Sequence, residues 1–399
     1  MKILTVSSLY PNANEPKHGI FVRNRLTHLL KHFPDVEAKV IAPVPWFPIK
    51  LNWGPFAQYA KFAGVPAHEK RDGLDVYHPR YLVIPKIGMH LTPYFMRRSI
   101  EKQARKLIKQ GYDFELIDGH YFFPDGVAIA GVAQSLSKPF TCTARGTDIN
   151  LIPQQPKARE KITRVAELAG ACITVCEALK TSLLSFARVG DKAFALRNGV
   201  DLGFFTPTNE REQQILKQQQ WRVPNNKKLI VSVGHLVERK GHYLVIDAMK
   251  SLPDCHLVIA GDGPDRGALQ KQVEEAGLAS RVTFAGALSQ DELKVLYQAA
   301  DTLVLASSRE GWANVLLEAM ACGTAVVATN LWGTPEVVAK PEAGVLVERN
   351  VGALVQGINQ LTASPPSRAD TRAYAEGFDW YDTSKGQYDI FTRLVGKNT

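Results

Sequence analysis

The stretch REGWANVLLEAMACGTAVVAT at residues 309–329 decides the fold of this chain. Between Ala313 and Cys322 only Asn314 and Glu318 are polar, so this segment is predicted to be a mostly buried helix. The apolar run that follows is short and is predicted to be a buried strand. A buried helix joined directly to a buried strand is typical of a parallel sheet whose faces are covered by helices.

The same alternation of strands and helices extends from this stretch through the whole chain. In the second half, strands are predicted at 228–234, 256–261, 281–286, 302–307 and 324–329. In the first half, they are predicted at 2–8, 38–43, 74–79, 114–119, 140–144 and 171–175. The sequence therefore predicts an α/β protein of two Rossmann-like units with parallel sheets, joined by a polar linker at about 203–227. Ligands of such sheets bind at the carboxyl ends of the strands, and we expect the two edges to face each other across a cleft.

The composition is that of a globular protein. Apolar residues make up 45% of the chain and charged residues 22%, and no apolar run is long enough for a membrane helix. The N-terminal segment MKILTVSSLYPN is predicted to be a first strand rather than a signal peptide. The five cysteines lie in apolar segments and lack metal-ligand spacing, so we expect reduced core thiols in a cytoplasmic protein.

The net charge of +9 is confined to the first half of the chain. Residues 1–200 contain 28 Lys and Arg against 16 Asp and Glu (+12), and residues 201–399 contain 20 against 23 (−3). No nucleic-acid recognition module or repeat is visible, so nucleic acid is not expected as a partner. An anionic membrane surface or an anionic substrate fits this charge equally well.

Two segments of the second half have the features of anion sites. VGHLVERKG follows a predicted strand and places Arg239 and Lys240 at the start of a helix, where cations suit a diphosphate, although a solvated basic turn would have the same sequence. SSREGWANV leads into the helix of the opening stretch, whose first N–H groups are free to bind anions. Glu310 and Glu318 bracket seven small or uncharged residues, and each needs a cation or ligand hydroxyl groups as a partner. Such a site suits a nucleotide sugar.

A resemblance covers nearly the whole chain. EGWANVLLEAMACGTAVVAT with the later GTPEVV resembles the Glu-x7-Glu signature region of family 4 retaining glycosyltransferases, which have the GT-B fold. VGHLVERKG, VIAGDGP, VTFAGALSQDELKVLYQAAD and RNGVDLGFF stand in the family's order and spacing. SSLYPN, HGIFVRNRL, IDGHYFFPDGVAIA and PFTCTARGTDI are similar to its acceptor half. The subgroup that the chain most resembles makes bacterial envelope polysaccharides and exopolysaccharides, including teichuronic-acid-type transferases.

The resemblance implies a domain organisation and a reaction. Residues 1–203 would form the acceptor-binding domain and 204–375 the nucleotide-sugar donor-binding domain, with a helix at 376–395 crossing back onto the first domain. The protein would transfer a hexose-type sugar from a nucleoside-diphosphate sugar to a saccharide acceptor, expected to be lipid-linked, with retention of anomeric configuration. Its expected role is the synthesis of bacterial cell-surface polysaccharide.

The resemblance also implies roles for individual residues. Glu318 would bind the ribose hydroxyls and Glu310 the donor-sugar hydroxyls, while Arg239 and Lys240 would hold the diphosphate and stabilise the leaving group. His120 matches a family histidine near the reacting centre, so it joins Arg239, Lys240 and Glu310 as an expected catalytic residue; a structural strand-end histidine is the alternative. Further donor contacts are expected from Gly19, Gly234, Gly263, Gly311, Trp312, Ala313, Asn314 and Val315, and acceptor contacts from Tyr121, Arg145 and Asp148.

Three departures from the family pattern bear on these roles. Gly234-His235 stands where the family often has Gly-Arg, so Arg239 would replace a phosphate-binding cation. Arg145-Gly146 stands where the family often has His-Gly, which points to an anionic acceptor. The first loop has one glycine where two are frequent. No Asp-x-Asp occurs, so neither a metal ion nor another cofactor is expected.

Two segments of the basic half have the composition of an interfacial surface. The segment 92–112 is predicted to be an amphipathic helix with six Lys and Arg against one Glu, and 44–62 interleaves aromatic residues with lysines. We therefore expect peripheral contact with the anionic inner face of the membrane. The alternative is a solvated basic helix beside an ordinary acceptor loop.

Two other functions share the predicted architecture. A nucleotide-sugar epimerase would use the same donor site but no second substrate, and the basic, aromatic first half argues against it. A non-catalytic sugar-nucleotide binding protein is disfavoured because both glutamates and both cations are present. A dinucleotide-dependent oxidoreductase is disfavoured because no GxGxxG follows either first strand.

Overall fold

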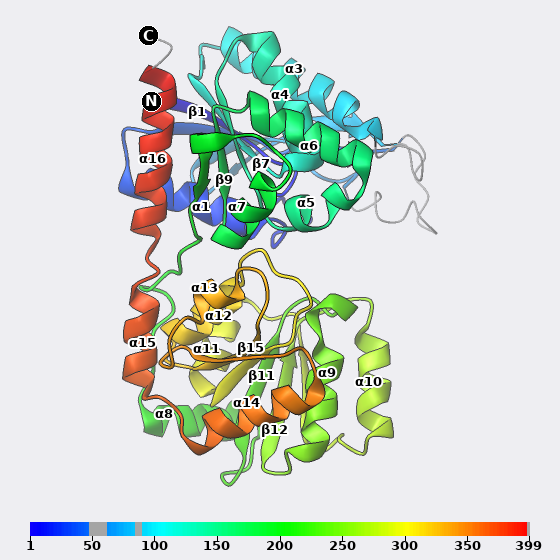
Figure 1. Cartoon of the computed structure of the whole chain (residues 1–399), viewed down its shortest axis with the longest axis vertical. Coiled ribbons are helices and arrows are strands. Elements are labelled where there is room, and N and C mark those ends of the chain that lie inside the picture. Colours follow the sequence, from blue (N-terminus) through cyan, green and yellow to red (C-terminus); the bar gives the residue numbers. More distant parts are fainter. Residues whose placement is uncertain (48–61, 84–89, 397–399) are drawn as a thin grey trace. The chain divides into compact units, whose positions relative to one another are not determined.

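The computed structural model describes residues 1–47, 62–83 and 90–396, and Figure 1 shows the chain as two compact units. Unit 1 contains Met1–Asn198 and Trp380–Thr399, and unit 2 contains Gly199–Asp379. The boundary therefore lies at Asn198, slightly before the position predicted from the sequence.

The sheet of unit 1 has eight strands in the order β10-β9-β8-β7-β1-β2-β5-β4. The predicted strands all form, as β1 (Lys2–Val6), β2 (Glu37–Ile41), β5 (Leu74–Tyr77), β7 (Leu116–His120), β8 (Phe140–Thr143) and β9 (Ala171–Thr174). Two edge strands were not predicted, β4 (His68–Arg71) and β10 (Ala193–Ala195), because one is wholly polar and the other is only three residues long. β4 runs antiparallel to β5, so the expectation of a purely parallel sheet is wrong at this edge. A separate parallel pair joins β3 (Val44–Trp46) to β6 (Arg80–Leu82).

Helices cover both faces of this sheet (Figure 1). α1 (Ile20–His32) and α16 (Trp380–Gly396) pack together on one face, and α3 (Thr92–Lys109), α4 (Val127–Leu136) and α6 (Pro156–Leu168) lie on the other. The short helices α5 (Thr147–Asn150) and α7 (Glu177–Leu184) follow β8 and β9. α16 buries Ile390 and Phe391 in the same apolar cluster as Ile3 and Leu26, so the C-terminal end of the chain completes the core of unit 1.

The sheet of unit 2 has six parallel strands in the order β13-β12-β11-β14-β15-β16. The five predicted strands form as β11 (Lys228–Val233), β12 (Cys255–Ala260), β13 (Val282–Gly286), β14 (Thr302–Leu305) and β15 (Val326–Thr329), and β16 (Gly344–Val347) adds an edge. α9 (His242–Ala248), α10 (Arg266–Glu275) and α14 (Val351–Ala363) share one apolar cluster with these strands. The opposite face carries α11 (Gln290–Ala299) and α12 (Asn314–Ala321) (Figure 1). α13 (Thr334–Val337) follows β15.

The predicted linker at 203–227 is part of unit 2. α8 (Glu210–Ile215) begins at an Asn209 cap, and the Gln213 amide donates to the carbonyl oxygen of Ala300 at 3.1 Å. Lys217 forms an ion pair with Asp301 at 2.8 Å. The polar composition of this segment therefore reflects a helix packed on the unit, not a free connection.

The predicted helix at 376–395 is interrupted. α15 (Arg368–Glu376) belongs to unit 2, and α16 starts only at Trp380. Arg368 holds α15 in place by donating to the carbonyl oxygens of Cys322 at 2.7 Å and Ala300 at 3.0 Å.

Among the parallel strands, the chain order reverses once in each sheet. In unit 1 the reversal lies between β1 and β7, and in unit 2 between β11 and β14. The loops after such a pair of strands leave in opposite directions and open a crevice at the carboxyl edge, where ligands of α/β sheets bind. We therefore expect the predicted ligand-binding residues to lie at the carboxyl ends of β1 and β7 in unit 1 and of β11 and β14 in unit 2.

Candidate functional site

The two predicted anion-binding segments of unit 2 meet at its strand reversal. β11 and β14 are neighbours, with Val231 opposite Leu303, so the loops after them start next to each other at the carboxyl edge of the sheet. The amide of Ser308 donates to the carbonyl oxygen of Arg239 at 2.7 Å, which joins the loops directly. Gly241 permits this approach: its φ is 70°, and a Cβ would lie 2.0 Å from the carbonyl oxygen of Ala306.

Lys240 and Glu310 form an ion pair between these loops. The ammonium nitrogen lies 2.5 Å from a carboxylate oxygen of Glu310, and the Ser307 hydroxyl donates to the same oxygen at 2.6 Å. Glu310 is 8% exposed, and the half-buried ammonium group of Lys240 compensates its charge. A cation was one of the two predicted kinds of partner for Glu310, but neither the choice of Lys240 nor the contact with Ser307 was predicted, because a sequence shows which charges follow a strand but not which of them touch. Arg239 is half-buried and donates to the carbonyl oxygen of Arg309 at 3.4 Å.

Glu318 has a neutral partner instead of a cation. The Tyr297 hydroxyl of α11 donates to its Oε2 at 3.0 Å. Burial raises the pKa of Glu318 to about 7, and the hydrogen bond from Tyr297 offsets only part of this effect. A half-buried carboxylate held by one hydroxyl group retains acceptor capacity, which suits further hydroxyl groups of a ligand.

The remaining residues predicted to contact a donor also lie in unit 2, apart from Gly19. Gly234 and Gly263 are in the loops after β11 and β12. Gly311 precedes α12, Ala313 is its N-cap, and Asn314 and Val315 are in its first turn. Trp312 is buried with its ring 6.2 Å from that of Phe378, so its side chain packs inside the unit.

Unit 1 brings His120 and Arg145 together at its own edge. His120 ends β7, and its Nε2 lies 3.1 Å from an oxygen of Asp118. Its Nδ1 lies 2.6 Å from Nη2 of Arg145. Because guanidinium can only donate, Nδ1 must accept and the proton is on Nε2. Burial lowers the pKa of His120 to about 4, so the ring is neutral at pH 7 and both nitrogens are engaged.

Asp148 has a positioning role in the loops of unit 1. Its buried carboxylate accepts hydrogen bonds from the backbone N–H groups of Phe122, Arg145 and Gly146 at 2.9 to 3.0 Å. It therefore ties the loop after β7, which includes Tyr121 at a φ of 73°, to the loop after β8. Burial raises the pKa of Asp148, against the effect of these three bonds.

Gly19 has a structural role in unit 1, and its donor contact stays a prediction. It precedes α1 with a φ of 65°, and a Cβ would lie 2.2 Å from the carbonyl of Leu9. The same loop is anchored by Asp125, which sequence reasoning missed: its carboxylate accepts from the Ser8 amide at 2.5 Å and the Ser8 hydroxyl at 2.9 Å. Burial raises the pKa of Asp125 to about 7.

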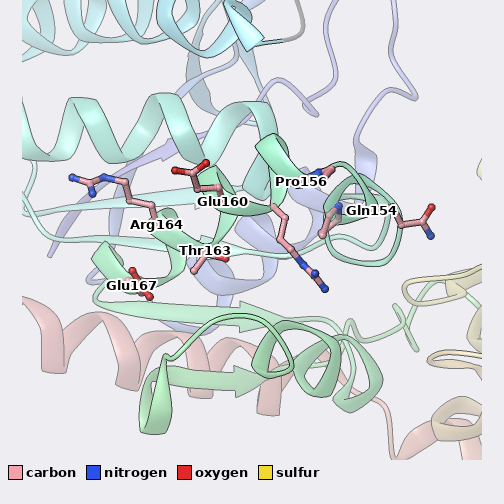
Figure 2. Close-up of a pocket in the computed structure, with 8 residues that line it drawn as sticks. Gln154, Pro156, Glu160, Thr163, Arg164 and Glu167 are labelled. Atoms are coloured by element: carbon pink, nitrogen blue, oxygen red, sulfur yellow. The ribbon is translucent and has the colours of Figure 1, made fainter.

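A surface hollow elsewhere in unit 1 contains none of the predicted residues. Figure 2 shows this hollow of about 440 Å³ beside α6, lined by Pro153, Gln154, Pro156, Arg159, Glu160, Thr163, Arg164 and Glu167. Its arginines and glutamates alternate along an exposed helix, as is usual for a solvated face.

Within the described part of the chain, no helix is both long and apolar enough to cross a membrane. All five cysteines are buried and unpaired, as predicted.

Comparisons with known families match both halves of the chain. Residues 213–378 match the model of "Glycosyl transferases group 1", and residues 59–204 match the model of "Glycosyltransferase Family 4". The glycosyltransferase TuaC of Bacillus subtilis (strain 168), named for teichuronic acid biosynthesis, is 28% identical over 100% of this chain and 96% of its own length. A D-inositol 3-phosphate glycosyltransferase of Mycobacterium leprae is 32% identical over 50% of this chain and 49% of its own length.

Solved structures share the fold over nearly the whole chain. Sucrose-phosphate synthase from Thermosynechococcus elongatus superposes with a TM-score of 0.79 at 19% identity, covering 100% of both chains. Anabaena Alr3699/HepE, crystallised with UDP and glucose, has a TM-score of 0.74 at 21% identity and covers 98% of this chain and 100% of that one. At these identities the likeness concerns the fold alone.

Proposed function

We propose a specific reaction for this chain, which belongs to the glycosyltransferases of family 4 and has their GT-B fold. It transfers a sugar from a nucleoside-diphosphate sugar to a saccharide acceptor with retention of anomeric configuration. The prediction of a glycosyltransferase is confirmed by both family models, and the epimerase and the non-catalytic binding protein are not supported.

The observation that supports this reaction best is the cluster at the strand reversal of unit 2. Lys240, Glu310 and Ser307 from the two loops lie at the carboxyl edge where α12, the helix that carries Glu318, begins. Arg239 and Lys240 would stabilise the diphosphate as it leaves, because positive charge fixed beside developing negative charge lowers the barrier. Glu310 and Glu318 would accept hydrogen bonds from sugar and ribose hydroxyl groups. The acceptor hydroxyl would attack from the face that the diphosphate leaves and pass its proton to a phosphate oxygen.

The proposed reaction uses no metal ion. The cations Arg239 and Lys240 and the amino end of α12 would supply the positive charge that a metal provides elsewhere. Transfer should therefore persist in excess EDTA, and loss of activity on chelation that Mg²⁺ restores would contradict this part.

The names of relatives extend the proposal to a pathway. TuaC is named for teichuronic acid biosynthesis, so we place the reaction in bacterial cell-surface polysaccharide synthesis, with a lipid-linked acceptor on the cytoplasmic face of the membrane. UDP and UDP-glucose bind the structural neighbour HepE, which makes uridine diphosphate sugars the first donors to test.

The basic face of α3 supports contact with that membrane. Arg98, Lys102, Lys106 and Lys109 are exposed along it, and a hollow of about 700 Å³ lies between this face and Arg80. The other predicted contact, 44–62, lies mostly outside the described residues. Vesicles with anionic lipid should carry the protein upward in flotation and neutral vesicles should not; equal flotation would contradict the membrane contact.

The test of the reaction is the configuration of the product. Donor sugars are incubated with the protein and a bacterial lipid extract, and the anomeric proton of the transferred sugar is followed by NMR before it equilibrates. Retention of the donor's configuration is expected. An inverted product, or free sugar as the only product with every donor and acceptor, would contradict the proposed reaction.

A further inference from the structure

A polar network under the carboxyl edge of the unit 1 sheet holds two arginines without an ion pair. Arg25 is 1% exposed and donates to the amide oxygen of Gln387 and the carbonyl oxygen of Leu196, both at 3.0 Å. Arg145 donates to His120. Each of these acceptors is neutral, and in the described part of the chain no carboxylate lies within 4.0 Å of either guanidinium. A buried cation without a contacting anion is costly, so this arrangement calls for an explanation.

The guanidinium of Arg145 has donors to spare. The guanidinium group has five N–H groups. One of them, on Nη2, donates to Nδ1 of His120, and Nη1 lies 3.5 Å from the amide oxygen of Asn198. Its Nε is buried without a hydrogen-bond partner. One face of the group lies over the Phe21 ring at 5.3 Å. Burial and the nearby Arg25 lower the pKa of Arg145 to about 9, which still leaves it charged at pH 7.

A chain of hydrogen bonds fixes the orientation of this guanidinium. Asp118 is fully buried in β7 and also lies within hydrogen-bond distance of the hydroxyls of Thr5 and Thr141. It accepts from Nε2 of His120, which leaves Nδ1 as the acceptor for Arg145. Burial alone would raise the pKa of Asp118, but His120, Arg25 and Arg145 together lower it, so the aspartate is ionised. The aspartate thus determines the tautomer of the histidine, and the histidine holds the arginine.

The position of Arg145 makes it reachable by a ligand. It follows β8 at the carboxyl edge of the sheet, where ligands of α/β sheets bind, and the residue is half-buried although its Nε is covered. Phe21, on which it stacks, is in the first turn of α1, whose amino end carries partial positive charge. The surroundings therefore add positive potential, in a half of the chain whose excess charge is +12 (28 Lys and Arg, 16 Asp and Glu in residues 1–200).

We propose that Arg145 determines acceptor specificity by binding an anionic group of the acceptor, a carboxylate or a phosphate, and that Asp118 and His120 are its positioning residues. The proposal rests on the proposed function of the chain as a glycosyltransferase. It assigns the anion to the acceptor because Arg145 and all its contacts belong to unit 1, the half of the chain that is similar to the family's acceptor domain. Gly19 of the same unit is an expected donor contact, so the titration with UDP is included to separate the two substrates. Guanidinium binds carboxylate and phosphate through two parallel hydrogen bonds, which a neutral sugar cannot provide. His120 then acts through Arg145 instead of touching the reacting atoms.

Direct binding of small anions tests the site without an assay of transfer. The full chain is labelled with ¹⁵N-histidine, and the His120 ring signals are identified by their absence from a His120→Gln variant. Glucuronate, inorganic phosphate, glucose and UDP are titrated separately at constant ionic strength set by NaCl. Glucuronate or phosphate should shift the His120 signals with saturation, because an anion on the guanidinium alters its bond to Nδ1. Glucose should not.

Variants separate this role from simple loss of charge or structure. Arg145→Gln should weaken the response at least about tenfold, since a charge-assisted pair is lost. Arg159→Gln is the matched control: Arg159 also stacks on a phenylalanine, Phe186, at 5.3 Å, but is exposed, and this variant should respond like wild type. If Arg145→Gln does not fold, Arg145→Lys decides, because a lysine cannot form the bidentate pair; a response as strong as that of wild type would contradict the proposal.

The remaining outcomes identify the source of the anion. No saturable shift with any anion, or an unchanged response in Arg145→Gln, overturns the proposal. If UDP shifts the His120 signals through Arg145 and neither glucuronate nor phosphate does, Arg145 binds the donor's diphosphate. This result also overturns the proposal. Nucleotide-sugar binding measured on the same samples keeps the two claims apart. Arg145→Gln should bind a donor as wild type does, and a chain that binds no donor at all would count against the proposed function instead.

Discussion

At the scale of single residues, the structure gives several predicted ligand contacts a structural role as well. The resemblance to family 4 implied ligand contacts for Gly19, His120 and Asp148, and each of these residues lies at or after the carboxyl end of a strand. Their immediate contacts are internal, however: Asp148 holds backbone amides, and His120 lies between Asp118 and Arg145. A sequence gives the strand end at which a side chain stands, but not the tertiary partners that occupy its polar atoms.

Gly19→Ala should disrupt the first loop, whereas Gly73→Ala should be mild. Both glycines have positive φ, 65° and 81°, but a Cβ at Gly19 would meet the Leu9 carbonyl at 2.2 Å and one at Gly73 would meet nothing within 4 Å. Gly73→Ala should cost about 1 kcal/mol of unfolding free energy for the left-handed backbone, and Gly19→Ala should cost clearly more. Urea unfolding compares them, and equal losses would contradict the close contact.

Glu318 should make the stability of unit 2 depend on pH. Its pKa is raised from 4.5 to about 7, so the folded state holds the proton more tightly than the unfolded state. The resulting stabilisation is present below about pH 4.5 and is lost as pH rises through about 7, a change of up to roughly 3 kcal/mol before solvent screening reduces it. The stability of unit 2 should therefore depend less on pH in the Glu318→Gln variant than in wild type. Hydrogen exchange of α12 at about pH 5 and pH 8 tests this, and identical pH dependence would contradict it.

At the scale of elements, the buried strands were predictable, whereas three of the four edge strands of the two large sheets were not. Every strand predicted from a continuous apolar run is present, because central parallel strands are buried on both faces. The edge strands β4, β10 and β16 were missed because pairing, not composition, makes them strands. The segment at 203–227 was misjudged for a related reason, since the contacts of Gln213 and Lys217 are with residues distant in the chain.

The loops after β11 and β14 should be coupled through Lys240 and Glu310. A double-mutant cycle with alanine at both positions should give a coupling free energy of about 1–3 kcal/mol, because this pair is largely removed from water. Lys250 and Asp247 form an exposed pair at 2.7 Å and should couple by no more than about 0.5 kcal/mol. Urea unfolding of the variants gives both coupling free energies. If the two coupling free energies are similar, the pair of Lys240 and Glu310 does not join the loops.

At the scale of the whole molecule, the chain's last helix belongs to the unit that contains its first strand. Phe391 is fully buried in the cluster with Ile3 and Leu26, so Phe391→Ala should destabilise unit 1 by about 3–5 kcal/mol. Asp389→Ala on the same helix removes only an exposed ion pair with Lys385 and should change little. Hydrogen exchange should show faster opening of β1 and α1 in the Phe391 variant. Unchanged protection there would contradict the packing of α16.

The central claim is that the edge between β11 and β14 binds a nucleoside-diphosphate sugar. Its most direct test is a thermal-shift titration of nucleotide sugars in EDTA, beginning with UDP-glucose, on wild type and Glu318→Ala. A donor at about a hundred times its Kd should add about 2.7 kcal/mol to the unfolding free energy of wild type, and the variant should lose most of this gain. If a donor stabilises both proteins equally, Glu318 does not contact it and the assignment of the site is wrong.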